Sequence, residues 1–256
     1  MPSEVDPGAI APAPGASLAP GRGPAVLPRD FFARQATLVA PDLLGCVLVH
    51  DTPAGRVGVE LVEVEAYTGE SDPASHAFRG RTARNAVMFG EPGHAYVYFT
   101  YGMHFCVNLV CQPSGEAAAV LIRAGRVIEG RDLATARRAG RAPGSRSPVS
   151  TFGPDAGAAI SARVSRHLAS GPARLCQALG IDRAQNGIDV CDGGSALRVL
   201  APAGPWPVAA GRIARGPRVG VRDGAETDWR FWIAGDPAVS AYRPHVLRRR
   251  GGPVTS

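Results

Sequence analysis

An apolar stretch of the chain ends in two glutamates and a tyrosine at alternating positions, Glu63, Glu65 and Tyr67. Because residues of equal parity share one face of a β-strand, these side chains should point the same way as Val57. A strand end that leaves the core and becomes solvated would explain the carboxylates. A carboxylate at the lip of a cavity, with an aromatic ring beside it, would instead suit general-base chemistry. The segment alone leaves both interpretations open.

A loop rich in polar residues follows this predicted strand and carries Asp72 and His76. Three arginines come next within six residues, in a setting of Gly, Thr and Asn: Arg79, Arg81 and Arg84. Guanidinium groups at a loop-to-helix junction suit contacts with phosphate. Ordinary surface charge explains the arginines equally well, and a lone loop histidine is usually solvated.

Tyrosines are concentrated in the same region. Tyr96 and Tyr98 share a face of the next predicted strand, and Tyr101 lies at the turn that follows it. Aromatic rings stack on nucleobases whatever their sequence, and a projecting apolar residue can wedge between base pairs. An aromatic residue that merely closes a hairpin is the alternative for Tyr101. Together with a carboxylate able to activate water, these groups suit an enzyme that flips a nucleotide and cleaves its glycosidic bond.

Composition narrows the class of protein. The 256 residues include 28 basic and 22 acidic side chains, and every basic one is arginine because the sequence contains no lysine. A lysine Schiff base is therefore excluded as a mechanism. Five cysteines at irregular spacing argue against a disulfide scaffold and fit a reducing compartment. No window resembles a membrane span or a secretory signal, so we expect a cytoplasmic protein, associated with the nucleoid if the source is bacterial.

The distribution of Gly, Pro, Ala and Arg predicts the domain organisation. Residues 1–27 should form a disordered leader, because they offer too little apolar surface to offset the entropy of ordering. One domain should cover 28–243, with an Arg-rich loop insertion at 137–170, and a basic flexible tail should cover 244–256. The insertion could be a solvated loop or a loop that contacts phosphates.

Strands dominate the predicted elements. We expect one or two helices over 29–44, with Asp30 as the N-cap and Gly45 as the stop, and a helix over 174–179 that ends at Gly180. Expected strands cover 46–50, 57–66, 95–101, 105–111, 118–123, 198–200, 218–221 and 230–233. Because helices do not alternate with strands, the pattern predicts a mixed α+β fold around an antiparallel sheet.

The ordered motifs of the chain resemble the alkyladenine (3-methyladenine) DNA glycosylase family. The matching segments are 62–67 (VEVEAY), 72–76 (DPASH), 79–82, 84–85, 88–89, 92–98 (PGHAYVY), 101–103, 120–123 (VLIR), 175–180, 217–221 (PRVGV) and 229–231. The resemblance implies a single compact domain on a curved antiparallel sheet with flanking helices and no helix-hairpin-helix. It also implies a monofunctional enzyme of base excision repair that needs no metal or cofactor. Such an enzyme would act, as a monomer, on double-stranded DNA that contains an alkylated or deaminated purine.

The resemblance also implies roles for individual residues. Glu65 would be the general base and Arg123 its partner in holding the attacking water. Tyr67 would stack on one face of the flipped base and His76 and Tyr98 on the other. The remaining matches are Asn108 against the exocyclic amine of guanine, Tyr101 and Met103 at the wedge, and Arg81, Arg84 and Arg174 on DNA phosphates.

Two alternatives remain open at the level of sequence. The family usually has an Ala-x-Glu-Pro turn after Arg123, whereas this chain continues with Ala-Gly-Arg-Val. A misoriented Arg123 would leave a non-catalytic reader of damaged or kinked DNA. A metal hydrolase that uses Glu65 with His76, His94 and His104 is a weaker alternative, because the spacings match no helical metal motif.

Overall fold

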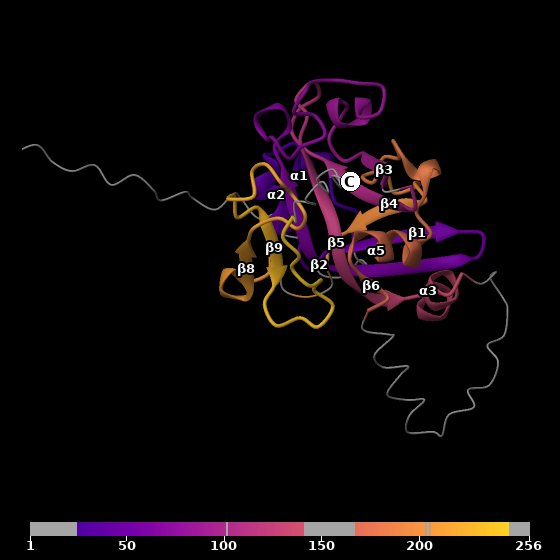
Figure 1. Cartoon of the computed structure of the whole chain (residues 1–256). Coiled ribbons are helices and arrows are strands. Elements are labelled where there is room, and N and C mark those ends of the chain that lie inside the picture. The colour runs from indigo at the N-terminus through magenta and orange to yellow at the C-terminus, as the bar shows by residue number, and fades with distance from the viewer. Residues whose placement is uncertain (1–24, 101, 141–166, 203, 205, 246–256) are drawn as a thin grey trace, which may run out of the picture.

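The structure is a computed structural model that describes residues 25–100, 102–140, 167–202, 204 and 206–245. Its described strands are β1 (Val47–Thr52), β2 (Gly55–Tyr67), β3 (Ala95–Thr100), β4 (His104–Val110), β5 (Ala119–Glu129), β6 (Ala169–Ser170), β7 (Leu197–Leu200), β8 (Ile213–Gly216) and β9 (Arg230–Ile233). All nine belong to one antiparallel sheet that does not close into a barrel (Figure 1). The predicted mixed α/β fold in a single domain is confirmed.

The long strand β2 organises the sheet. The main path runs β3-β4-β5-β2-β1-β7, while β9 pairs with the end of β2 and β8 pairs with β9. Register shifts interrupt the β2–β5 pairing between Gly58 and Val59 and on both sides of Glu63. Such bulges bend a strand and re-aim its side chains. The two shifts beside Glu63 lie where β2 changes its second neighbour from β1 to β9.

Short helices cover the sheet. They are α1 (Arg29–Phe32), α2 (Ala36–Asp42), α3 (Arg131–Arg138) and α5 (Pro172–Leu179), with 3-10 turns η1 (Gly69–Ser71), η2 (Ala86–Phe89), η3 (Arg183–Gln185) and η4 (Ala210–Arg212). Helix α5 begins with Pro172 and ends at Gly180, whose φ of 72° is left-handed. Its apolar residues join the main core, and the helix packs against β4 and β5 (Figure 1).

The apolar residues form two clusters. The main core contains residues of α1, α2 and α5 and most strands of the sheet. A smaller cluster around Ala77, Met88, Tyr96, Val110 and Ala119 lies beneath the segment that joins β2 to β3. Figure 1 shows that segment above β3 and β4. None of the helices within the described ranges is long and apolar enough to cross a membrane.

Several local expectations were wrong. Pro28, not Asp30, is the N-cap of α1, and Asp30 lies inside the helix. Residues 218–221 are not a strand, because Arg218 is drawn into a buried ion pair. The strands β6 and β8 and the helix α3 were not expected. Both faces of β2 are buried near the end of the strand, so its side chains do not alternate there between core and solvent. Glu63 and Glu65 have no exposed surface.

The structure describes some residues of each expected part of the chain: the leader, the domain, its insertion and the tail. Residues 1–24 of the expected leader, 141–166 of the insertion and 246–256 of the tail lie outside the described residues. The chain already packs at Leu27, whose N–H donates to the Val199 carbonyl at 2.9 Å. The described ends of the insertion are the last turn of α3 and strand β6, which pairs with β5.

Candidate active site

Strand pairing places side chains from distant parts of the chain in one row. Tyr96 of β3 lies opposite Asn108 of β4, which lies opposite Leu121 of β5, which in turn lies opposite Glu65 of β2. Directly paired residues project from the same face of a sheet. A parallel row sets Tyr67 opposite Ala119. The small alanine leaves space between the larger side chains.

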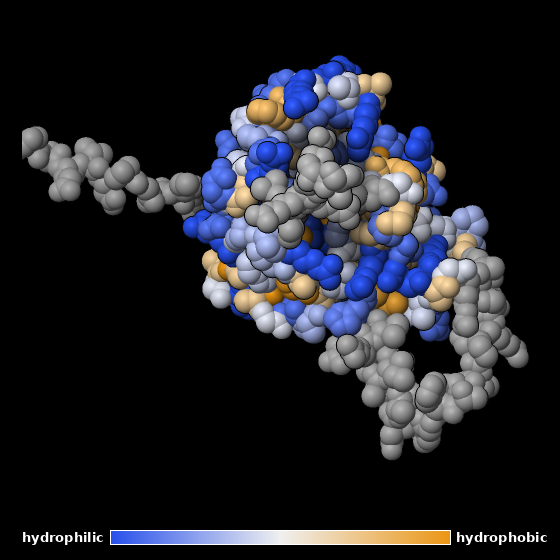
Figure 2. Space-filling model, viewed as in Figure 1, coloured by the Kyte–Doolittle hydropathy of each residue, from blue (hydrophilic) through white to orange (hydrophobic). Residues whose placement is uncertain are grey.

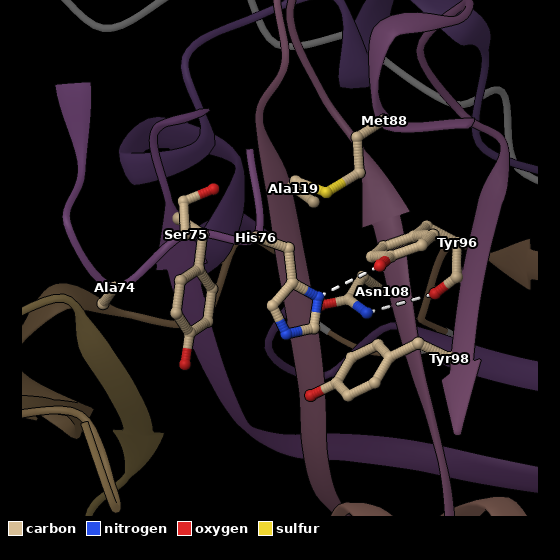
Figure 3. A pocket seen from close by; sticks show the side chains of 9 residues that line it. Ala74, Ser75, His76, Met88, Tyr96, Tyr98, Asn108 and Ala119 are labelled. Carbon is tan, nitrogen blue, oxygen red and sulfur yellow. Dashed lines mark hydrogen bonds between the residues drawn. The ribbon is translucent and has the colours of Figure 1, made fainter. Parts of the chain in front are cut away.

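This space is a pocket of about 350 Å³, part of it open to solvent. Its lining includes four of the residues predicted to hold a base, together with small and apolar neighbours: Tyr67, Ala74, Ser75, His76, Met88, Tyr96, Tyr98, Asn108 and Ala119. Figure 3 shows His76, Tyr96, Tyr98 and Asn108 converging on it from separate segments.

One wall of the pocket is an aromatic group of three rings. The imidazole of His76 lies 4.5 Å from the ring of Tyr98, edge to face, and its Nδ1 is 3.0 Å from the hydroxyl of Tyr96 (Figure 3). Asn108 is held on the floor, where its amide N–H donates to the Tyr96 carbonyl at 3.1 Å. Desolvation, with a smaller contribution from the cation of Arg84, lowers the pKa of His76. A lowered pKa favours the neutral form of the imidazole.

A buried amide fixes the loop that carries His76. Asn85 is only 2% exposed, and its side-chain N–H groups donate to the carbonyls of His76 and Gly80 at 2.9 and 3.0 Å. Its carbonyl oxygen accepts from the N–H and the hydroxyl of Thr82 at 2.6 and 2.9 Å. Asn85 thus ties the His76 loop to the segment of Arg81 and Arg84.

Glu65 is fully buried and has a partner for each carboxylate oxygen. The hydroxyl of Tyr67 donates to Oε2 at 2.9 Å, and the N–H of Val219 donates to Oε1 at 2.7 Å. A guanidinium nitrogen of Arg123 lies 3.3 Å from Oε1. Burial raises the pKa of both Tyr67 and Tyr98, and the charge of Glu65 contributes to each shift.

A second buried carboxylate holds Arg123 in place. Glu63 accepts from Arg123 Nε at 2.9 Å, from Arg230 Nε at 2.7 Å and from the N–H and hydroxyl of Ser240 at 2.7 and 2.8 Å. Burial alone would lower the pKa of Arg123, but the charges of Glu65 and Glu63 raise it above its ordinary value. Arg123 is thereby a fixed cation between two carboxylates.

Behind the pocket lies a buried ion pair. Arg218 contacts Asp72 through two nitrogens, at 2.5 and 2.9 Å, and each residue is 1% exposed. Asp72 also accepts from the N–H groups of Ala74 and Thr68. The pair anchors the start of the loop that carries His76 to the segment just before Val219.

The turn that is usual in the family after Arg123 is replaced in this chain by continuous strand. Strand β5 continues to Glu129, and Gly125 pairs with both Leu61 and Ala169. A Cβ on Gly125 would lie 2.4 Å from the Glu60 carbonyl oxygen, so only glycine fits there. Arg123 is held within continuous sheet and contacts Glu63 and Glu65, so the missing turn does not release its side chain.

The residues predicted to contact DNA are spread more widely. Tyr101 lies outside the described residues. Met103 is 68% exposed beside the β3–β4 turn. Arg81 and Arg84 are exposed near the aromatic wall, with their guanidinium carbons 6.0 Å from the rings of Phe89 and Tyr98 respectively. Arg174 is exposed on α5, which packs into the main core and not against the pocket. Figure 2 shows hydrophilic side chains gathered over α5.

The described residues offer no support for the metal-site alternative. In the parts of the chain that the structure covers, no three His, Cys, Asp or Glu side chains are placed to hold a metal ion. His94 lies near the Glu91 carbonyl and Arg29, whereas His76 faces Tyr96. Cys106 and Cys111 are buried free thiols of the sheet region.

Sequence reasoning missed the residues that support the site. Asn85, Asp72 and Arg218 occur in the recognised motifs, but nothing in their local pattern indicated burial. Arg230 lies in the 229–231 motif and Ser240 in none, and nothing local indicated that they contact Glu63, which lies 167 and 177 residues earlier in the chain. The one available hint was the carboxylate of Glu63, two residues before Glu65 on the same predicted face.

Comparison with known proteins places the chain in a family. The model of the family described as "Methylpurine-DNA glycosylase (MPG)" matches residues 30–237. Three relatives whose names include the words 3-methyladenine DNA glycosylase come from Streptomyces avermitilis, Leifsonia xyli and Methanocella arvoryzae. They are 53%, 48% and 46% identical over 91%, 85% and 86% of this chain and 98%, 92% and 98% of their own lengths. The chain belongs to the methylpurine-DNA glycosylase family, whose members are hydrolases of N-glycosyl bonds.

Proposed function

We propose that this DNA glycosylase flips an alkylated or deaminated purine out of double-stranded DNA and hydrolyses its N-glycosidic bond without cutting the strand. The observation that carries the proposal is the buried carboxylate of Glu65, hydrogen-bonded to a tyrosine that lines the pocket. The names of the relatives favour 3-methyladenine among the substrates.

Glu65 acts as the general base in this proposal. It takes a proton from a water molecule whose oxygen then bonds to C1′ of the sugar. The bond from C1′ to the purine nitrogen breaks and its electron pair leaves with the base. A purine alkylated at N3 or N7 carries a positive charge, so it departs as a neutral molecule and needs no proton donor. The products are a free purine and an abasic site.

Arg123 helps to hold the attacking water beside Glu65. Its charge is set between Glu65 and Glu63, and its Nε is already used by Glu63 at 2.9 Å.

The pocket recognises the flipped base by stacking and by shape. Tyr67 provides one wall, and the neutral His76 and Tyr98 provide the other. Asn108, fixed by its hydrogen bond to Tyr96, crowds the exocyclic amine of undamaged guanine. Bases that pair poorly cost less to extrude, which adds to selectivity.

The remaining residues act on the DNA. Tyr101 and Met103 fill the gap left by the flipped nucleotide, as apolar wedges do in other proteins that unstack base pairs. Arg81, Arg84 and Arg174 contact phosphates. Because such contacts release counterions, affinity should fall steeply as salt increases.

A strand-break assay tests the proposal. Duplex DNA with one 7-methylguanine or hypoxanthine would be incubated with the protein and then analysed with and without hot alkali. Breaks that appear only after alkali are expected, because an abasic site survives until base treatment. Breaks without alkali would contradict the monofunctional mechanism, and intact DNA under both conditions would contradict excision of that lesion.

A further inference from the structure

The ring of Tyr67 has a buried guanidinium against it. The central carbon of Arg218 lies 4.6 Å from the centre of the Tyr67 ring and 5.1 Å from that of Trp229. Tyr67 lines the pocket, whereas Arg218 does not and is 1% exposed. The ring of Tyr67 therefore separates the pocket from Arg218.

The guanidinium is itself held on several sides. Its two terminal nitrogens contact both oxygens of Asp72, one of them also donates to the Ala66 carbonyl at 3.0 Å, and the other donates to the Gly224 carbonyl at 3.3 Å. Ala66 immediately precedes Tyr67 in β2. The plane of Arg218 is thus fixed relative to the backbone that carries the stacking ring.

The same segment also reaches Glu65. The residue after Arg218 is Val219, whose N–H donates to Glu65 Oε1 at 2.7 Å, while Tyr67 donates to the other oxygen at 2.9 Å. Both neutral donors to the carboxylate are therefore adjacent to Arg218, one through the chain and one through ring stacking.

We propose that Arg218 is a positioning residue that holds both the Tyr67 ring and the Glu65 carboxylate in place, so that base stacking and water activation both depend on it. The inference rests on the proposed function. Arginine suits this task because its planar fork can stack on a ring and hold a carboxylate with two hydrogen bonds at once. A lysine would keep the charge but provide neither the plane nor the paired donors.

Arg218→Lys tests the proposal in single-turnover excision, which separates the maximal rate from the enzyme concentration at half-maximal rate. We expect the maximal rate to fall roughly ten- to hundredfold, since small misplacements of reacting groups carry penalties of that order. The half-maximal concentration should rise as well, because the stacking wall is loosened. The matched control is Arg126→Lys, which disturbs the ion pair with Glu60 elsewhere on the sheet and should leave both values unchanged.

A double-mutant cycle with Tyr67→Ala separates positioning from simple loss of stability. If Arg218 acts on base binding through Tyr67, Arg218→Lys should raise the half-maximal concentration much less in the Tyr67→Ala background than in the wild type. Equal effects in both backgrounds would overturn the proposal. So would wild-type kinetics for Arg218→Lys in a protein that melts at a lower temperature.

Two further outcomes have their own interpretation: an Arg218→Lys variant that does not fold, and a wild-type protein that excises no purine. If Arg218→Lys does not fold, Asp72→Asn loosens the same guanidinium and should give the same pattern of changes at smaller size, and wild-type kinetics there would overturn the proposal. If the wild-type protein itself excises no purine, the proposed function fails first. This inference fails alone when the wild type is active and either Arg218→Lys shows wild-type kinetics or its effect is equal in both backgrounds.

Discussion

Replacement of Glu63 by alanine should destabilise the fold more than any surface substitution. Glu63 is completely buried, and its carboxylate accepts four hydrogen bonds from Arg123, Arg230 and Ser240. Removing it leaves two guanidinium groups that are 6% and 4% exposed without their shared partner. Breaking a buried ion pair from one side costs about 3–5 kcal/mol. For a domain of this size that corresponds to a fall in Tm of about 6–20 °C.

Glu60→Ala is the matched control, because Glu60 lies on the same strand and also pairs with an arginine. Its partner Arg126 has a side chain that is 42% exposed and retains Asp236. Exposed pairs contribute about 0.2–1 kcal/mol, so the fall in Tm should be at most about 4 °C. Differential scanning calorimetry of both variants measures the contrast. Equal Tm values for Glu63→Ala and Glu60→Ala would refute the assignment of Glu63 as the buried anchor.

Three other predictions concern separate parts of the molecule. Hydrogen bonds from Arg56 and Arg198 lower the pKa of Asp51 from 3.8 to about 2, so the ionised Asp51 should stabilise the fold above pH 4 and lose this effect as the pH falls through 2. Urea melts of the wild type and of Asp51→Asn should therefore converge at low pH. A Cβ on Gly69 would lie 1.7 Å from the Ala117 carbonyl oxygen, so Gly69→Ala should lower the free energy of unfolding by well over the roughly 1–2 kcal/mol that a left-handed backbone alone costs. Gly187→Ala, whose Cβ would have no atom within 4 Å, should cost only that amount, and chemical denaturation compares the two variants. Burial raises the pKa of the cysteine thiols, that of the half-buried Cys191 to about 12. A thiol reagent at pH 7 should therefore react slowly with the native protein but readily with all five cysteines after unfolding, and rapid reaction of the native protein would contradict the described burial.

Local pattern was enough to predict most elements of the fold. The alternating apolar run of β2, the aromatic strand β3 and the Pro172–Gly180 limits of α5 are properties of neighbouring residues, and the structure confirms these elements. The error at 218–221 has a tertiary cause: Arg218, the first residue of the expected strand, pairs with Asp72, 146 residues earlier. No local signal distinguishes that arginine from a solvated one.

The candidate site was predictable in its residue types but not in its support. Glu65 and Tyr67 were indicated by spacing on one strand, and their hydrogen bond agrees with that. Burial of Glu65 depends on Val219 and Arg123, which β2 meets only when the sheet has assembled. The register that sets Tyr96, Asn108, Leu121 and Glu65 in one row is likewise a property of four strands together.

The most direct test of the account is the single-turnover excision rate of Glu65→Gln on a duplex with one 7-methylguanine. Glutamine keeps the size of the side chain and can still accept from the N–H of Val219, so folding and DNA binding should persist. Loss of a general base should lower the rate about 10²–10⁴-fold. A rate equal to that of the wild type, with lesion binding unchanged, would contradict the assignment of Glu65 as the group that activates water.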